Sequence, residues 1–193
     1  TKIMNRIAEN SNKTGGNATE SAAMRGQRKN LKMITTEDMV GLDFSEITAK
    51  FMEYENFQVK GNYFESANTA SAFIQDSEIK MIIARFIEDL EIEGTVSKDD
   101  WMELCKEIFD RVVPGTNKAI ITMNKLVNKG FKARAHGESL QDYFRRFNTL
   151  LVRTKWLRNV YNKPNDPEWE TETLKSFIYK LKSWASDHVI EMA

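Results

Sequence analysis

Apolar side chains recur every three or four residues through most of this chain, and this spacing constrains its fold more than any other feature. The pattern is strongest in SEIKMIIARFIEDLEIEG (77–94), SKDDWMELCKEIFDRVVPG (97–115) and HGESLQDYFRRFNTLL (136–151). Such spacing places the apolar residues on one face of an α-helix. No convincing pair of segments alternates apolar and polar residues as strands do. The sequence therefore predicts an all-α fold with short connections.

Capping residues and helix-breaking residues mark where the predicted helices begin and end. Polar residues open them, and glycine or proline follows several of their ends. We expect N-caps at Asp43 (with Glu46), Ser77, Ser97 (with Asp100), Ser139 (with Asp142) and Asp166, which precedes Pro167. Gly94, Pro114-Gly115 and Gly130 are the expected terminators. A weaker helix is expected within 62–73, another over 116–130, and a short closing helix over about 186–193.

The distribution of residue types predicts a two-domain organisation. Residues 1–30 are polar, rich in Asn, Ser, Thr and Gly, and have the composition of a flexible arm. An N-terminal domain is expected over 31–130 and a C-terminal domain over 131–193. KGFKARAHGES (129–139), with two glycines and little apolar content, is the best candidate for the linker.

Charge and cysteine content limit the class of protein. Lys and Arg together number 28, as do Asp and Glu, so the net charge is zero. Non-specific nucleic-acid binding usually needs a basic excess, which makes nucleic acid an improbable main ligand. One cysteine, Cys105, excludes an internal disulfide and a multi-cysteine zinc site, and indicates a reducing, cytoplasmic compartment. No apolar run reaches membrane-spanning length. The glycosylation-like patterns at Asn12 and Asn17 are interpreted as chance matches.

The sequence offers little that points to catalysis, and no cofactor or metal is expected. His136 and His188 are far apart and show no metal-ligand spacing. Cys105 falls on the apolar face of its helix, where a small buried residue is the simpler interpretation. Phosphate-binding glycine loops and the aspartic-protease signature are absent. We therefore expect a protein that is not an enzyme.

Two basic clusters leave two interpretations open. Each is a group of lysines and arginines close in sequence: Arg25, Arg28, Lys29 and Lys32, and then Lys129, Lys132 and Arg134. Solvated surface is the plainer interpretation, and contact with RNA or another anion is the alternative.

The segment ESLQDYFRRF (138–147) resembles the major homology region of Gag capsid proteins, in the form found in Gypsy-type LTR retrotransposons. The short form of that motif is Q-x-G-E-S followed by an aromatic–Arg–Phe pattern, and the matching residues are Gly137, Glu138, Ser139, Leu140, Tyr143, Arg146 and Phe147. A helix running from Trp101 to Phe109 lies upstream, and TLKSFIYKL (173–181) lies downstream, as in that family. The resemblance covers about residues 97–185.

The chain departs from the family pattern at two positions. The motif's glutamine is missing, and Arg134 or Ala135 stands in its place. Lys180 stands where a glycine is common. Glu138 and Arg146 are eight residues apart and cannot pair as neighbours on one helix. We expect Glu138 to precede the helix and Arg146 to reach back to it, tying the linker to the helix. Either this pair does without the glutamine, or Arg134 contributes in its place.

The resemblance implies a structural Gag capsid protein. Such a chain assembles with copies of itself into hexamers, pentamers and two-fold dimers that form a particle shell around RNA, which other Gag segments contact. The helix carrying Trp169, Thr173 and Phe177 corresponds to the one that makes the two-fold contact. Trp169 is the better interface candidate, whereas Phe177 competes as a core residue, in a buried stripe with Leu174, Ile178 and Leu181. A domesticated Gag-derived adaptor or RNA carrier, and a helical RNA-coating nucleoprotein, remain the alternatives.

Overall fold

The structure is a computed structural model that describes residues 28, 31–36, 44–90, 95–115, 118–163 and 166–191. By its contacts, the chain divides into two units, Thr1–Lys32 and Met33–Ala193. Several predictions lie outside the described residues. They are the arm over 1–30 apart from Arg28, the glycosylation-like Asn12 and Asn17, the basic residues Arg25 and Lys29, the Asp43 cap and the Gly94 terminator.

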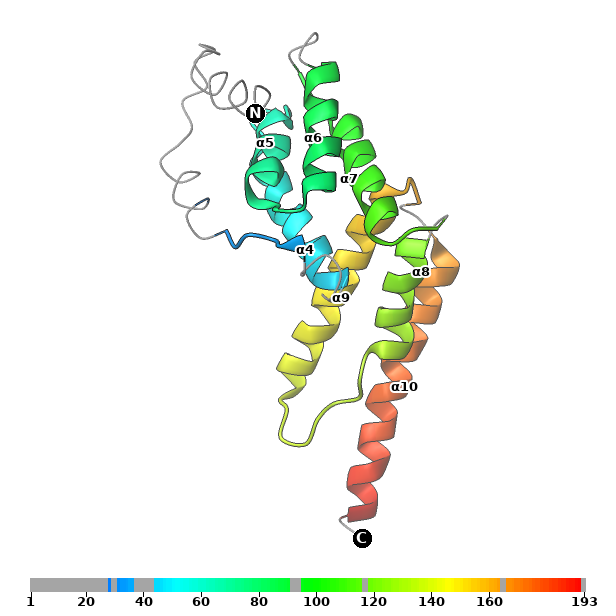
Figure 1. The fold of residues 1–193 in the computed structure, drawn as a ribbon. Coiled ribbons are helices and arrows are strands. Elements are labelled where there is room, and N and C mark those ends of the chain that lie inside the picture. The colour runs from blue at the N-terminus through cyan, green and yellow to red at the C-terminus, as the bar shows by residue number, and fades with distance from the viewer. Residues whose placement is uncertain are drawn as a thin grey trace. The chain divides into compact units, whose positions relative to one another are not determined.

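All the regular elements in the described residues are helices, which confirms the predicted all-α class (Figure 1). The helices are α4 (Phe44–Glu55), α5 (Phe64–Phe73), α6 (Ser77–Leu90), α7 (Lys98–Val112), α8 (Lys118–Lys125), the π-helical turn η1 (Leu126–Gly130), α9 (Leu140–Val160) and α10 (Pro167–Glu191). Within these residues no strand forms, and only isolated bridges join Ile34 to Ile74 and Val59 to Asn62. None of the described helices is both long and apolar enough to cross a membrane.

Most of the predicted caps form, and two predicted boundaries are wrong. Ser97 and Asp100 make a full capping box, in which each side chain binds the other residue's amide. Asp76, rather than Ser77, caps α6, because its Oδ1 accepts the amide of Ile79 at 3.0 Å. The predicted short closing helix does not stand alone, since α10 continues through Glu191.

Helices α4 to α7 pack around a core of aromatic side chains. Phe51 of α4 lies at its centre, with its ring 5.1 Å from that of Phe109 and 6.3 Å from that of Trp101. All three are fully buried. The Trp101–Phe109 helix predicted from the sequence therefore supplies two of the main core residues of this part of the chain.

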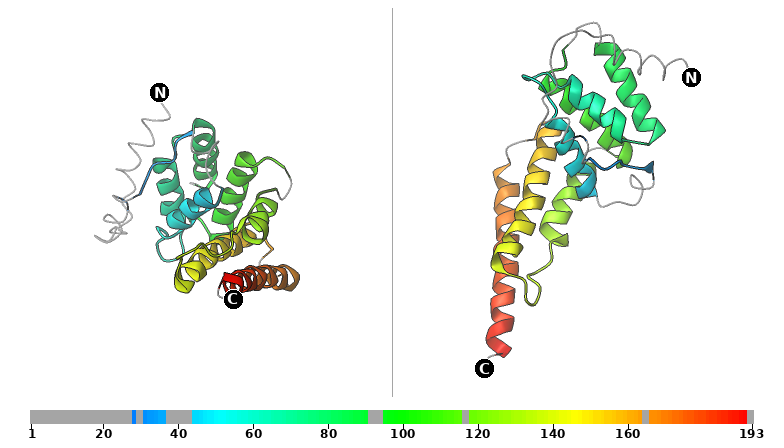
Figure 2. Two further views of the ribbon diagram at one scale, coloured as in Figure 1. Left: turned by 90° about the horizontal axis from the view of Figure 1, so that it is seen from below. Right: turned by 90° about the vertical axis from the view of Figure 1, so that its left-hand side faces the viewer.

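Helix α9 joins this core to a second one. Its C-terminal half packs against α4 and α7, and its N-terminal half lies beside η1 and α10 (Figures 1 and 2). Polar contacts fix the first interface. Arg153 Nη1 donates to Ser45 and to Glu46 at 2.8 Å, and Tyr161 donates to Asp110 at 2.7 Å. Because one helix serves both cores, and residues 33–193 form one compact unit, the predicted division into two domains near residue 130 is not confirmed.

Candidate functional site

The motif that carries the family resemblance begins with a tight turn before α9. Gly137 adopts a left-handed backbone conformation with φ +80°, which glycine reaches without steric cost. The chain then enters α9 through Ser139, whose hydroxyl accepts the Asp142 amide at 3.0 Å and donates to the Asp142 carboxylate at 2.7 Å. This confirms the predicted Ser139 cap.

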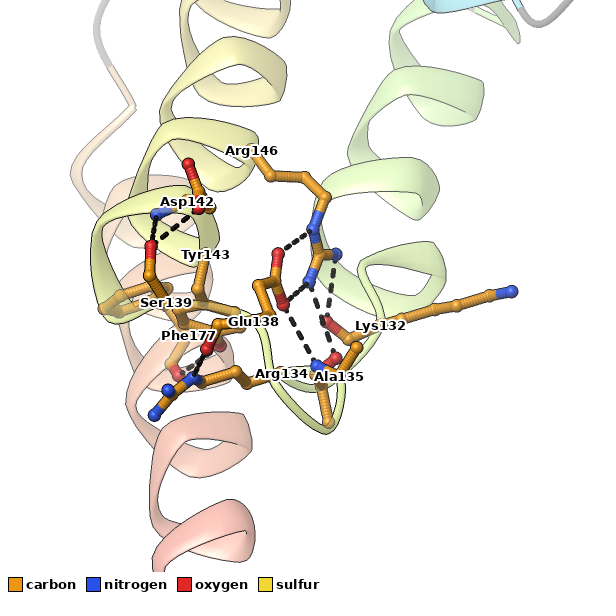
Figure 3. A network of polar contacts seen from close by, with 10 residues as sticks. Lys132, Arg134, Ala135, Glu138, Ser139, Asp142, Tyr143, Arg146 and Phe177 are labelled. Atoms are coloured by element: carbon orange, nitrogen blue, oxygen red, sulfur yellow. Dashed lines mark hydrogen bonds and ion pairs between the residues drawn. The ribbon is translucent and has the colours of Figure 1, made fainter.

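Glu138 and Arg146 form a two-pronged ion pair across this turn (Figure 3). Arg146 Nε donates to Glu138 Oε1 at 3.1 Å, and Arg146 Nη2 donates to Oε2 at 2.9 Å. The amide of Ala135 donates to the same Oε2 at 3.0 Å. The glutamate side chain is 16% exposed and the arginine 37%. The predicted tie between linker and helix is confirmed.

Arg146 also holds the chain that leads into the turn. Its guanidinium donates to the carbonyl oxygen of Lys132 at 3.2 Å and to that of Ala133 at 3.5 Å. Arg134 donates through Nε to the carbonyl oxygen of Glu138. Arg134 therefore takes part where the family has glutamine, although it binds the main chain and not the carboxylate. We call Glu138, Arg146 and Arg134, with the carbonyls they bind, the linker lock.

The linker lock lowers the pKa of the Glu138 carboxylate. The hydrogen bond from Arg146 is the main cause that lowers the pKa of Glu138 below its usual range, and the Ala135 amide adds to it. Glu138 therefore stays ionised to a lower pH in the folded protein than in the unfolded chain.

Beneath the linker lock lies a second aromatic core. Its buried members are Val127, Phe131, Tyr143, Phe147 and Phe177. The rings of Phe147 and Phe177 are 4.4 Å apart, and the Arg146 guanidinium lies 4.6 Å from the centre of the Phe131 ring. The lock and this core thus share Arg146, which contacts both the polar turn and an aromatic face.

The three residues predicted to form the two-fold interface are all buried within the chain. Trp169 is 5% exposed and packs under the Arg158 guanidinium, 4.7 Å from its ring centre. Thr173 is 2% exposed and donates to Asn128 Oδ1 at 3.0 Å. Phe177 lies in the second core, as its competing interpretation predicted. Trp169, the better interface candidate by sequence, is thus buried in the single chain, and its contact with a second copy stays a prediction.

Other apolar residues lie on the exposed surface of α9 and α10. Leu174 is 56% exposed and Ile178 is 41% exposed, so their predicted burial is wrong. Phe144 is 48% exposed, with its ring 5.0 Å from that of Phe177. The set, which we call the α9–α10 apolar face, consists of Leu140, Phe144, Leu174 and Ile178. Sequence analysis missed it because helical spacing alone does not say which arc of an apolar stripe meets the core.

Lys180 contributes a contact that the sequence did not predict. Its ammonium donates to the carbonyl oxygens of Asn128, at 2.9 Å, and of Phe131. These carbonyls lie at the end of η1. The last carbonyls of a helix have no main-chain N–H group within the helix to bind them. Desolvation lowers the pKa of the Lys180 ammonium. The lysine at the family's usual glycine position thus anchors α10 to the π-helical turn.

Two observations concern the thiol and the possible metal ligands among the described residues. Cys105 is fully buried, and burial raises the pKa of its thiol well above the usual range, which disfavours the nucleophilic thiolate. No cluster of His, Cys, Asp and Glu suited to a metal ion occurs in this part of the chain. His188 lies in the C-terminal stretch whose side chains are outside the description.

Comparison with known protein families, with curated proteins and with solved structures gives no match to this chain.

Proposed function

We propose that this chain is a structural Gag capsid protein of the Gypsy type, which assembles with copies of itself into a shell around RNA. The observation that carries the proposal is the linker lock. It joins the motif residues Glu138 and Arg146 across a turn that leads into a capped helix. An ordinary capped amphipathic helix does not require a pairing of these two residues, whereas the resemblance to the capsid motif predicts it.

The α9–α10 apolar face supports self-association. Four large apolar residues remain exposed on two neighbouring helices, and burying them against a second copy removes that area from water. This face takes the interface role that the resemblance assigned to Trp169 on the same helix.

Sedimentation analysis of two matched variants tests the proposal. Leu174→Lys places a charge on the α9–α10 apolar face and is expected to weaken dimers at least about tenfold, or about 1.4 kcal/mol. Ile121→Lys makes the same change at an exposed residue of α8 outside that face and is expected to leave association unchanged. Circular dichroism checks that both variants remain folded.

Two outcomes would contradict the proposed role of this face. One is a wild-type chain that stays monomeric at every concentration reached. The other is an equal loss of association in the two variants, because that would indicate a general charge effect.

A further inference from the structure

A groove between α6 and α7 has an apolar floor and an acidic rim. It encloses about 250 Å³ and is open to solvent. Ile82, Phe86 and Leu104 form its floor, and Phe86 is only partly buried. The carboxylates of Asp89, Glu103 and Glu107 stand around the rim, together with Arg85.

Two successive ion pairs join α6 to α7, and the next position along the groove has none. Arg111 of α7 binds Glu78 of α6, and one step further Arg85 of α6 lies 3.7 Å from Glu107 of α7. The helices run antiparallel, so the next step brings Asp89 of α6 to the side of the groove that Glu103 lines. Two carboxylates, those of Asp89 and Glu103, therefore line this end of the groove. Within the described part of the chain, no cationic side chain contacts either of them.

This like-charge position has a physical consequence. Both carboxylates are exposed, and like charges on the two sides of the groove repel each other. A cation from outside the chain relieves the repulsion and completes the alternating pattern. The apolar floor beside it receives an aliphatic or aromatic side chain at the same time, which is how an amphipathic helix lies in a groove.

We propose that the α6–α7 groove binds a basic amphipathic segment of another protein. One apolar side chain of that segment lies against Phe86 and Leu104, and a Lys or Arg lies between Asp89 and Glu103. The charge complementarity of the rim selects a basic partner over an acidic one. This inference does not depend on shell assembly, because the groove lies on helices that are separate from the α9–α10 apolar face.

Fluorescence anisotropy with labelled synthetic peptides tests the inference on the full chain. The probe is a short helical peptide of Leu and Lys, and the controls are a Leu/Glu peptide of the same pattern and a Ser/Lys peptide that lacks the apolar side chains. Wild-type protein is expected to bind the Leu/Lys peptide at least about tenfold more tightly than either control.

Two substitutions on the protein make the test specific to the acid–acid position. Glu103→Lys supplies the missing cation from within, so it is expected to raise Tm and to weaken binding of the Leu/Lys peptide at least about tenfold. Glu88→Lys makes the same charge change on an exposed residue of α6 outside the groove and is expected to leave the affinity within about twofold.

Three results would overturn the inference. The first is no binding of the Leu/Lys peptide by the wild-type chain. The second is an equal loss of affinity in Glu88→Lys and Glu103→Lys, which would indicate attraction to overall charge. The third is a wild-type dimer that Glu103→Lys dissociates, because the occupant would then be a second copy of this chain.

Discussion

Arg146 donates hydrogen bonds to main-chain carbonyl oxygens in a segment that belongs to no helix or strand. The segment between η1 and α9 has no regular backbone hydrogen bonding over 132–135. Lys132, Ala133 and Ala135 are exposed, so without side-chain contacts this segment has little to hold it in one conformation. Arg146 binds two of them, at Lys132 and Ala133, while Glu138 accepts the Ala135 amide and fixes the guanidinium. One ion pair therefore orders the whole entry to α9.

At this scale we predict that Arg146→Ala loosens the linker lock. The substitution leaves Glu138 without its partner and releases both carbonyls, so Tm is expected to fall by several degrees. Arg146→Lys keeps the charge but lacks the planar fork that reaches two oxygens at once, so an intermediate Tm is expected. Thermal unfolding followed by circular dichroism measures both. Equal stability of Arg146→Ala and wild type would refute a role for the lock in stability.

The same pair predicts how this difference depends on pH. The folded-state pKa of Glu138 lies below its unfolded value, so the pair stabilises the fold fully above the ordinary glutamate range. That contribution is lost as the pH falls through the lowered folded-state value. The Tm difference between wild type and Arg146→Ala is therefore expected to be largest near neutral pH and to shrink in acid.

Helix α10 shows how far sequence predicts an element. Asp166 caps it, Pro167 begins it and Phe177 is in the core, all as the sequence predicted. The stripe around Phe177 was placed wrongly in part. Leu181 packs against the core as predicted, but Leu174 and Ile178 are exposed, while Trp169 and Thr173 are buried.

The error arose because the sequence does not show which element α10 packs against. The helix packs on η1, where Thr173 and Lys180 bind Asn128. A π-helical turn has no clear sequence signal, and without it the orientation of α10 about its axis could not be predicted. The glycine at 130 predicted only a helix end.

At the element scale we predict that truncation to alanine has very different effects on stability at two residues one turn apart on α10. Phe177→Ala empties the centre of the second aromatic core and is expected to cost about 3–5 kcal/mol of unfolding free energy. Leu174→Ala removes an exposed side chain and is expected to change it by less than about 0.5 kcal/mol. Urea denaturation of both variants measures the difference. Similar costs would mean that the stripe predicted from the sequence is the buried one after all.

Across the whole molecule, α9 determines how the two cores behave together. The all-α class and the pairing of Glu138 with Arg146 followed from periodicity and from the resemblance. The long contact between α9 and the first core did not, because Arg153–Glu46 and Tyr161–Asp110 join residues far apart in sequence that no local pattern connects.

This sharing of α9 predicts one cooperative unfolding transition for residues 33–193. Tryptophan fluorescence reports on both cores, since Trp101 lies in the first and Trp169 packs on α9 beside the second. Fluorescence and circular dichroism are expected to give coincident denaturation curves. Two separated transitions would instead support the independent domains that the composition predicts.

Electron microscopy of the purified chain, concentrated at raised salt without RNA, tests the central claim most directly. A chain that encodes its own lattice is expected to form closed shells or tubes, and Leu174→Lys, with its altered α9–α10 apolar face, is expected to form none. Particles that appear only with RNA, as beaded filaments, or a chain that remains dispersed in both conditions, would contradict the capsid proposal.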